Sequence, residues 1–289
     1  MDKFLTNFVL NPKTEALIKI ALEEDLGSGD ITSNALIAQI AVCQATITAK
    51  AEGIICGLPV AEEVFRQTAK LMGVKINFRA LTNDGKLVEK GQVIVELSGN
   101  TRAVLAAERT ALNFLQQLSG VATLTHKFVE HSKARILDTR KTVPGMRLLQ
   151  KYAVKVGGGV NHRIGLYDAI LIKDNHIKAA GGVSSAIKRA KSSVVGRKPK
   201  PLIVVEVQSL KELGLAMDEL PDRILLDNLT LPAMKKAAQL CREAKIATEA
   251  SGGVNLKTAG AISRTGVDFI SVGALTHSAP ALDLSLKII

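Results

Sequence analysis

The sequence predicts an α/β fold in which parallel strands alternate with helices as a (β/α) barrel, preceded by a smaller α+β unit. Two observations predict it. From about residue 135 onward, short apolar runs alternate with helical patterns, and each apolar run ends abruptly in polar or glycine residues. Such alternation is typical of βαβ units, whose strands are parallel. An open doubly wound sheet is the competing arrangement.

The first hundred residues contain short elements of both kinds. Residues 13–24 (KTEALIKIALEE) carry a helical pattern, and PVAEEVFRQTAKLMG predicts a helix with Pro59 near its start and Gly73 at its end. The alternating stretch QATITAK predicts a half-buried strand, and VKINF, KLVEK and QVIVELSG predict three further short strands. We therefore expect a small α+β unit here.

From Thr101 the sequence becomes strongly helical and then alternates. TRAVLAAERTALNFLQQLSG predicts one helix, and a second helix is predicted over Leu124–Glu130. Six apolar runs follow, namely ILD, AILIK, LIVVEV, RILLDN, IATEAS and DFISVG. Helical patterns separate them: PGMRLLQKYAVK, VSSAIKRAK, SLKELGLAMDEL, LPAMKKAAQLCREAK and NLKTAGAISRTG. These runs predict the six strands of a parallel sheet.

Charged residues follow the predicted strands, and this favours the barrel. The carboxyl ends of parallel barrel strands converge on one face, where active sites lie. We expect five cations to meet there, opposed by two carboxylates: Arg140, Lys141, His162, Arg163 and Lys173, with Glu206 and Asp227. No acidic residue lies between Asp138 and Asp168 to neutralise the cations of that stretch. A solvated basic helix face is the alternative interpretation.

These residue types indicate a site for anions. Arginine grips carboxylates and phosphates with two parallel hydrogen bonds, and lysine supplies a mobile point charge. Glu206 and Asp227 are suited to Mg²⁺ that is held together with substrate phosphates. Simple ion pairs between these carboxylates and neighbouring lysines are the alternative, and His162 could be a structural histidine. A cluster of cations without an anionic ligand would repel itself.

Glycines follow the last two predicted strands, in Ser251-Gly252-Gly253 and at Gly273. Glycine lets backbone N–H groups approach a phosphate closely, and phosphate sites recur at the last two strand loops of such barrels. Ser-Gly-Gly alone could also form a turn. Together with the charged residues, these glycines predict a pocket for a phosphorylated, metal-bound polyanion and a second, carboxylated molecule.

Composition sets broad limits. The 289 residues are 47% hydrophobic and 22% charged, with a formal net charge of +11, which favours anionic partners. Aromatic residues make up only 3%, so stacking platforms for nucleic acid are scarce. MDKFLTNFVLNPKTE lacks the features of a secretory signal, and no apolar run is long enough for a membrane span. With three cysteines lacking CxxC spacing, we expect a reduced, cytoplasmic protein without zinc.

Several blocks of the sequence together resemble the quinolinate phosphoribosyltransferase family (nicotinate-nucleotide pyrophosphorylase, carboxylating). They are EEDLGSGDITS, AERTALNFLQQLSGVAT, LDTRKTVPGMRLLQKYAVKVGGGVNHRIGLYDAILIKDNH, VEV, LLDN, ASGG and ISVGALTHS. The long third block is highly specific, and the resemblance covers nearly the whole chain. Val143 and Met146 depart slightly from the family pattern, but neither is a ligand position.

The resemblance implies an organisation and a reaction. An N-terminal α/β sandwich would comprise residues 1–110 joined by the tail 278–289, and an open (β/α) barrel would comprise residues 111–277. A homodimer is implied in which each N-terminal domain covers the partner's barrel mouth. The implied reaction transfers a phosphoribosyl group from phosphoribosyl pyrophosphate to quinolinate, with Mg²⁺, and decarboxylates the product to nicotinate mononucleotide in de novo NAD biosynthesis.

The resemblance also implies roles for residues that match the family motifs. The quinolinate-binding set would be Thr139, Arg140, His162, Arg163 and Lys173, with Arg109 supplied by the other subunit. Lys141, Glu206 and Asp227 would hold phosphoribosyl pyrophosphate and its Mg²⁺, and with Lys173 they form the catalytic group. The 5′-phosphate would lie against Lys141, Ser251, Gly252, Gly253 and Gly273.

Three other functions compete with this interpretation. A related enzyme could act on nicotinate or another pyridine, and two arginines with a histidine favour a dicarboxylate over it. A barrel aldolase could use Lys173 as a Schiff-base amine. A basic nucleic-acid binder is the non-enzymatic alternative, but the sequence shows no recognised binding module.

Overall fold

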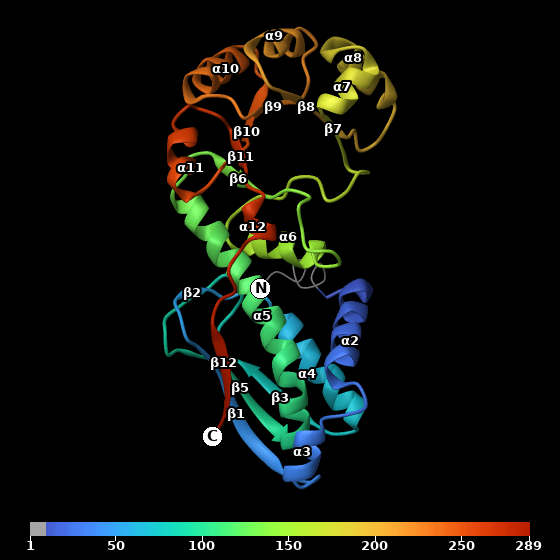
Figure 1. Cartoon of the computed structure of the whole chain (residues 1–289), viewed down its shortest axis with the longest axis vertical. Coiled ribbons are helices and arrows are strands. Elements are labelled where there is room, and N and C mark those ends of the chain that lie inside the picture. The colour runs from blue at the N-terminus through green and yellow to red at the C-terminus, as the bar shows by residue number, and fades with distance from the viewer. Residues whose placement is uncertain (1–9) are drawn as a thin grey trace. The chain divides into compact units, whose positions relative to one another are not determined.

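The computed structural model describes residues 10–289, and these fall into two compact units. The described part of the first unit comprises residues 10–126, Val143–Gly158 and Ser278–Ile289, and the second comprises Lys127–Thr142 and Gly159–His277. Figure 1 shows the elements of both units. The domain seams expected near residues 110 and 277 stay predictions.

The first unit is built on a four-stranded antiparallel sheet. Its order is β12 (Leu284–Ile288), β1 (Val42–Ala49), β5 (Val93–Asn100) and β3 (Ile76–Ala80). Two very short strands, β2 (Gly53–Ile54) and β4 (Leu87–Val88), pair separately. The predicted strand KLVEK is therefore much shorter than expected. Because β12 pairs with β1, the last residues of the chain complete a sheet formed by the first hundred.

The first unit also contains the helices α2 (Pro12–Leu26), α3 (Ile31–Leu36), α4 (Leu58–Met72) and α6 (Arg147–Val156). α4 packs on β3, and α2 packs on α4. Gly73 ends α4 with a positive φ of 66°, and its N–H is bonded to the last turn, as the sequence predicted. α6 begins at Arg147, three residues later than its pattern indicated.

Helix α5 corrects the prediction of two separate helices. It runs without interruption over Thr101–Glu130, through Gly120. A Cβ at Gly120 would lie 2.1 Å from the carbonyl oxygen of Pro280 and 3.0 Å from the Cα of Ala281. Glycine is therefore needed here for the close approach of the C-terminal segment, although it lowers helix propensity. A contact so distant in sequence leaves no local signal.

The second unit contains a six-stranded parallel sheet, and the predicted open barrel is confirmed. Its strands are β6 (Arg135–Leu137), β7 (Ala169–Ile172), β8 (Leu202–Val207), β9 (Arg223–Asp227), β10 (Ala247–Ser251) and β11 (Phe269–Ser271). The order is β6-β11-β10-β9-β8-β7. β6 and β7 end the sheet without pairing to each other, although one parallel bridge joins Leu137 to Val160. The barrel is open at this edge.

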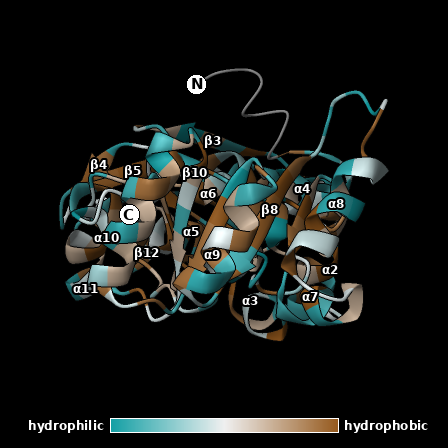
Figure 2. Ribbon diagram, turned by 90° about the horizontal axis from the view of Figure 1, so that it is seen from above, coloured by the Kyte–Doolittle hydropathy of each residue, from teal (hydrophilic) through white to brown (hydrophobic). Residues whose placement is uncertain are grey.

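Helices follow the strands of the second unit, as expected of βαβ units. They are α7 (Asp174–Ala180), α8 (Val183–Ser193), α9 (Leu210–Asp218), α10 (Leu231–Glu243), α11 (Leu256–Ser263) and α12 (Ala274–His277). Figure 2 shows β8 as a hydrophobic strand, and the adjacent helix α9 alternates hydrophobic and hydrophilic residues. This contrast reflects a strand that is covered on both faces and a helix that is covered on one.

The pattern missed three short helices, α3, α7 and α12. α3 follows Asp30, whose side chain caps it by accepting the Ser33 N–H at 2.9 Å. α7 begins directly at the polar end of β7. All three are too short to show a helical period. Within residues 10–289, no helix is long and apolar enough to cross a membrane.

The packing of α5 generates a stability prediction. Gly120→Ala should lower the free energy of unfolding by about 1–3 kcal/mol, because the added methyl group overlaps the backbone of Pro280. Urea denaturation of the purified protein measures the change. Gly214→Ala is the control, since Gly214 lies inside α9 with open space around it. That substitution should raise the stability by about 0.5–1 kcal/mol.

A Gly120→Ala variant as stable as the wild type would contradict the close packing of α5 against the C-terminal segment.

Candidate functional site

The carboxyl ends of the barrel strands enclose a cavity of about 680 Å³. The cavity is lined by residues of the second unit, and these include twelve of the site residues that we predicted from the sequence. They are Thr139, Arg140, Lys141, His162, Arg163, Lys173, Glu206, Asp227, Ser251, Gly252, Gly253 and Gly273. Polar side chains that are far apart in the sequence thus meet at one face, as the strand ends indicated.

Two arginines form the cationic side of the cavity. Burial lowers the pKa of the Arg163 guanidinium, and the positive charge of Arg140 lowers it further. The Nε atoms of Arg140 and Arg163 are buried and have no hydrogen-bond partner among the described residues. Two partly desolvated guanidiniums with unused donors favour an anionic ligand that would neutralise both.

The loop that follows Arg163 is held by Asp168. Its carboxylate accepts the Ile164 N–H at 2.7 Å and the Gly165 N–H at 2.9 Å. One guanidinium nitrogen of Arg163, Nη1, also approaches the Ala169 carbonyl oxygen at 3.3 Å, where β7 begins. These contacts fix the loop after Arg163 and one nitrogen of its guanidinium. The remaining guanidinium nitrogens are left to a ligand in the cavity.

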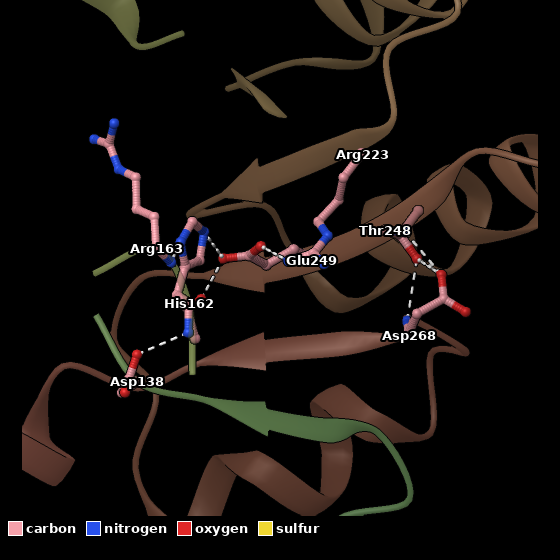
Figure 3. Close-up of polar contacts among 8 residues, drawn as sticks. Asp138, His162, Arg163, Arg223, Thr248, Glu249 and Asp268 are labelled. Atoms are coloured by element: carbon pink, nitrogen blue, oxygen red, sulfur yellow. Dashed lines mark hydrogen bonds and ion pairs between the residues drawn. The ribbon is translucent and has the colours of Figure 1, made fainter. Parts of the chain in front are cut away.

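His162 is anchored through its backbone and its ring (Figure 3). The buried carboxylate of Asp138 accepts the His162 N–H at 2.8 Å. Nδ1 of the ring accepts the Arg163 N–H at 2.6 Å, and Nε2 lies 3.5 Å from Oε1 of Glu249. Both ring nitrogens therefore face groups of the protein.

The cavity is also lined by the carboxylates of Glu206 and Asp227. Nζ of Lys173 lies 3.6 Å from Oε2 of Glu206, and the lysine side chain is half exposed whereas that of Glu206 is 11% exposed. Burial raises the pKa of Glu206; Lys173 opposes this shift, and the negative charge of Asp227 adds to it. The two carboxylates are thus close enough to repel each other.

This repulsion bears on the predicted magnesium site. A divalent cation between Glu206 and Asp227 would relieve it, and Mg²⁺ is usually bound by one or two carboxylates together with substrate phosphates. Among the described residues, no group of three or more His, Cys, Asp or Glu side chains could hold a metal ion. The carboxylate pair therefore fits a metal that arrives with a phosphorylated ligand, rather than one in a cage of protein ligands.

The glycines after β10 and β11 are required by close contacts. Gly252 has a φ of +96°, and a Cβ there would lie 2.1 Å from Oδ1 of Asn228. Gly253 also has a positive φ, but open space surrounds its missing Cβ. A Cβ at Gly273 would lie 3.1 Å from Nε2 of His277 and 3.2 Å from Cδ of Lys141. The open space at Gly253 is compatible with a phosphate beside backbone N–H groups.

Several residues of the site had been given no role from the sequence. The cavity is also lined by Asn228, Glu249, Ser271 and His277. Asp138 supports the site by accepting the backbone N–H of His162. Glu249 offered a signal, because a carboxylate inside an otherwise buried strand must be paired to be tolerated. Asp138 and Asn228 stood in the polar strand ends, but nothing in the sequence distinguished them from exposed loop residues.

Arg109 is placed differently from the other predicted residues. It is an exposed residue of α5 in the first unit and does not line the cavity of the second unit. Its predicted role in the site of another subunit stays a prediction.

The second unit is an open parallel barrel whose cavity holds a group of cations and a pair of carboxylates that suit a metal ion. These features define an enzyme that acts on small phosphorylated and carboxylated substrates. Residues 30–119 match the family described as "Quinolinate phosphoribosyl transferase, N-terminal domain", and residues 121–287 match "Quinolinate phosphoribosyl transferase, C-terminal domain". The chain belongs to the quinolinate phosphoribosyltransferase family.

Individual relatives agree with this assignment. A Bacillus subtilis protein named "Probable nicotinate-nucleotide pyrophosphorylase (carboxylating)" is 42% identical over 268 residues, covering 92% of this chain and 90% of that protein. A chloroplastic nicotinate-nucleotide pyrophosphorylase (carboxylating) of Arabidopsis thaliana is 41% identical, covering 95% and 82%. The solved structure of the nicotinate-nucleotide pyrophosphorylase of Francisella tularensis matches with a TM-score of 0.90 and 42% identity, covering 98% and 99%.

The contact at Gly252 generates a binding prediction. Gly252→Ala should weaken the binding of phosphoribosyl pyrophosphate with Mg²⁺ by at least about tenfold, because the new methyl group displaces Asn228 and distorts the loop predicted to hold the 5′-phosphate. Isothermal titration calorimetry measures the affinity. Gly181→Ala is the control, since Gly181 also has a positive φ but open space around it and does not line the cavity. Equal affinities of Gly252→Ala and wild type would rule out this loop as part of the phosphate site.

Proposed function

We propose that the protein is a quinolinate phosphoribosyltransferase (decarboxylating), a pentosyltransferase of de novo NAD biosynthesis. It transfers the phosphoribosyl group of phosphoribosyl pyrophosphate to quinolinate and gives nicotinate mononucleotide, pyrophosphate and CO₂. The names of the relatives that cover most of this chain support the reaction. One structural observation carries it furthest, the pair of half-buried arginines that line the same cavity as two carboxylates.

The geometry divides the cavity between two substrates. Arg140 and Arg163, with Thr139 and Lys173 beside them, suit the two adjacent carboxylates of quinolinate, because arginine binds carboxylates in a two-pronged manner. The glycines Gly252 and Gly273, with Lys141 next to Gly273, suit the 5′-phosphate of the ribosyl donor. The ring nitrogen of quinolinate would then face the anomeric carbon of the donor.

The reaction requires little proton transfer from the protein. The pyridine nitrogen attacks the anomeric carbon with its own lone pair while the bond to pyrophosphate breaks, so no general base is needed. Positive charge develops on the ribose, and the carboxylates of Glu206 and Asp227 stabilise it. The bond from ring carbon 2 to its carboxylate then breaks, and the cationic ring accepts the electrons. Protonation of that carbon, by Lys173 or by a nearby histidine, completes the product.

Glu206 and Asp227 would also hold Mg²⁺, which neutralises charge on the departing pyrophosphate. In this proposal, Lys141 holds the pyrophosphate end of the donor, and Lys173 keeps its ion pair with Glu206 until substrate enters. Catalysis then rests mainly on positioning and on fixed charges.

We further propose a homodimer with a shared active site. Arg109 is an exposed residue of α5 in the first unit. Supplied by the partner subunit, it would add a third arginine for the dicarboxylate. Such an arrangement is consistent with the excess of positive charge in the sequence and with two anionic substrates.

The activity test follows pyrophosphate release from phosphoribosyl pyrophosphate and Mg²⁺. Release should require quinolinate, and nicotinate should not replace it. Arg163→Ala should lower kcat/KM for quinolinate by at least about 30-fold, because truncating a desolvated arginine that grips a carboxylate costs about 2–5 kcal/mol. Arg197→Ala, at an exposed arginine outside the cavity, serves as control and should change little.

A loss below about fivefold in a folded Arg163→Ala variant would contradict the arginine clamp. Preferred turnover of nicotinate, or pyrophosphate release without a pyridine, would instead contradict the substrate.

The shared site is tested by mixing two inactive variants. Equal amounts of Arg109→Ala and Lys173→Ala subunits, unfolded and refolded together, should recover about a quarter of the wild-type activity, because half of the dimers are mixed and each has one intact site. The two variants refolded separately provide the baseline. Absence of recovery, with mixed dimers shown by native mass spectrometry, would place Arg109 outside the partner's site.

A further inference from the structure

Among the residues that line the cavity is a buried carboxylate to which the proposed mechanism gives no role. Glu249, at the centre of β10, is fully buried. Its Oε2 accepts a hydrogen bond from Nη1 of Arg223 at 2.9 Å, and its Oε1 accepts one from the Ser271 hydroxyl. Burial raises the pKa of Glu249, but the hydrogen bonds from His162, Ser271 and Arg223 outweigh it and hold the pKa below its ordinary value. The group is therefore a fixed carboxylate and a poor proton donor.

The contacts of His162 define the state of its ring. Nδ1 accepts the N–H of Arg163, so Nδ1 carries no proton in this arrangement. Nε2 then carries the proton and directs it toward Oε1 of Glu249, 3.5 Å away. In Figure 3 the His162 ring points toward Glu249, whereas the guanidinium of Arg163 extends away from this pair.

These contacts form one connected series of side chains. Arg223 and Ser271 fix Glu249, Glu249 fixes the His162 ring, and the ring fixes the backbone N–H of Arg163. Arg223 is itself held, since its guanidinium carbon lies 3.9 Å from the centre of the Phe269 ring. The series thus extends from the interior of the barrel to an arginine that lines the cavity.

We propose that Glu249 is a positioning residue for substrate binding, acting through the tautomer of His162 to hold Arg163 in its binding orientation. This inference rests on the proposed function, in which Arg163 binds a carboxylate of quinolinate. Hydrogen-bond partners that orient a ligand-binding group typically change affinity or activity about 10–100-fold when they are removed. The effect of Glu249 on the binding of quinolinate is therefore large enough to measure.

An amide at position 249 would reverse the hydrogen bonding. In Glu249→Gln, the amide oxygen must face the donor Arg223, because Arg223 cannot accept a hydrogen bond. The amide NH₂ then faces Nε2 of His162, which must give up its proton to accept. The proton moves to Nδ1, where it meets the N–H of Arg163. Two donors now face each other, and the backbone at Arg163 has to shift.

The test combines a spectroscopic and a kinetic measurement. Long-range ¹H–¹⁵N spectra of the wild type should show a His162 ring protonated at Nε2 and bare at Nδ1, and Glu249→Gln should lose or reverse this pattern. KM for quinolinate should rise about tenfold in Glu249→Gln, while KM for phosphoribosyl pyrophosphate stays within about twofold. A change in stability alone would not separate the two substrates in this way.

Thr248→Val is the matched control. Thr248 is the preceding residue of the same strand and is equally buried, but its hydroxyl bonds Asp268 at 2.8 Å and does not contact His162. It should leave the ring pattern and both KM values unchanged. Should Glu249→Gln fail to fold, Ser271→Ala removes one hydrogen bond from Glu249 and should raise KM for quinolinate about threefold.

Two results would overturn the positioning role: a wild-type His162 ring protonated at Nδ1, or a folded variant whose ring pattern and KM for quinolinate match the wild type. A wild type that does not turn over quinolinate would overturn the proposed function instead. In that case the ring spectra of wild type and Glu249→Gln still decide whether Glu249 sets the tautomer of His162.

Discussion

Repulsion between like charges is the constraint on which the site depends. Arg140 lowers the pKa of Arg163 on one side of the cavity, and Asp227 raises the pKa of Glu206 on the other. Each pair is unfavourable in the protein alone, because partial burial strengthens the interaction between charges. A carboxylated molecule would relieve the first pair, and a divalent cation with phosphates would relieve the second. One cavity of the barrel therefore contains a pair of cations that an anionic ligand would neutralise and a pair of carboxylates that a cation would neutralise.

Much of the second unit could be predicted because its strands are locally encoded. Each of the six strands is an apolar run followed by polar residues, and both properties are visible without the fold. α5 could not be predicted as one helix, because Gly120 serves a contact with Pro280, far along the chain. α7 is too short for a period and starts where the sequence shows only polar residues. Local sequence patterns fail to predict an element when a contact with a residue distant in the sequence determines it.

The same distinction divides the residues of the site. Those that face the cavity from strand ends, such as Arg140 and Asp227, were identified from type and position. Asp138 was given no role, because a residue that supports another has no spacing or composition of its own, and Glu249 was given none although a carboxylate inside a buried strand was a signal. Arg109 belongs to neither group, since its predicted place in the site requires a second copy of the chain. Sequence patterns thus predict the groups that touch ligands better than the groups that orient them.

The buried charges under the cavity follow from the kind of chemistry proposed above it. An apolar interior would have cost less, because a buried ion pair often contributes less than well-packed apolar residues of the same volume. A transfer that needs no general base depends on where the reacting groups are held, and small displacements are costly. Glu249 links the charged interior to His162 and Arg163 by directional contacts that apolar packing cannot supply. The charged interior is less stable than an apolar one would be, but it fixes the orientation of Arg163.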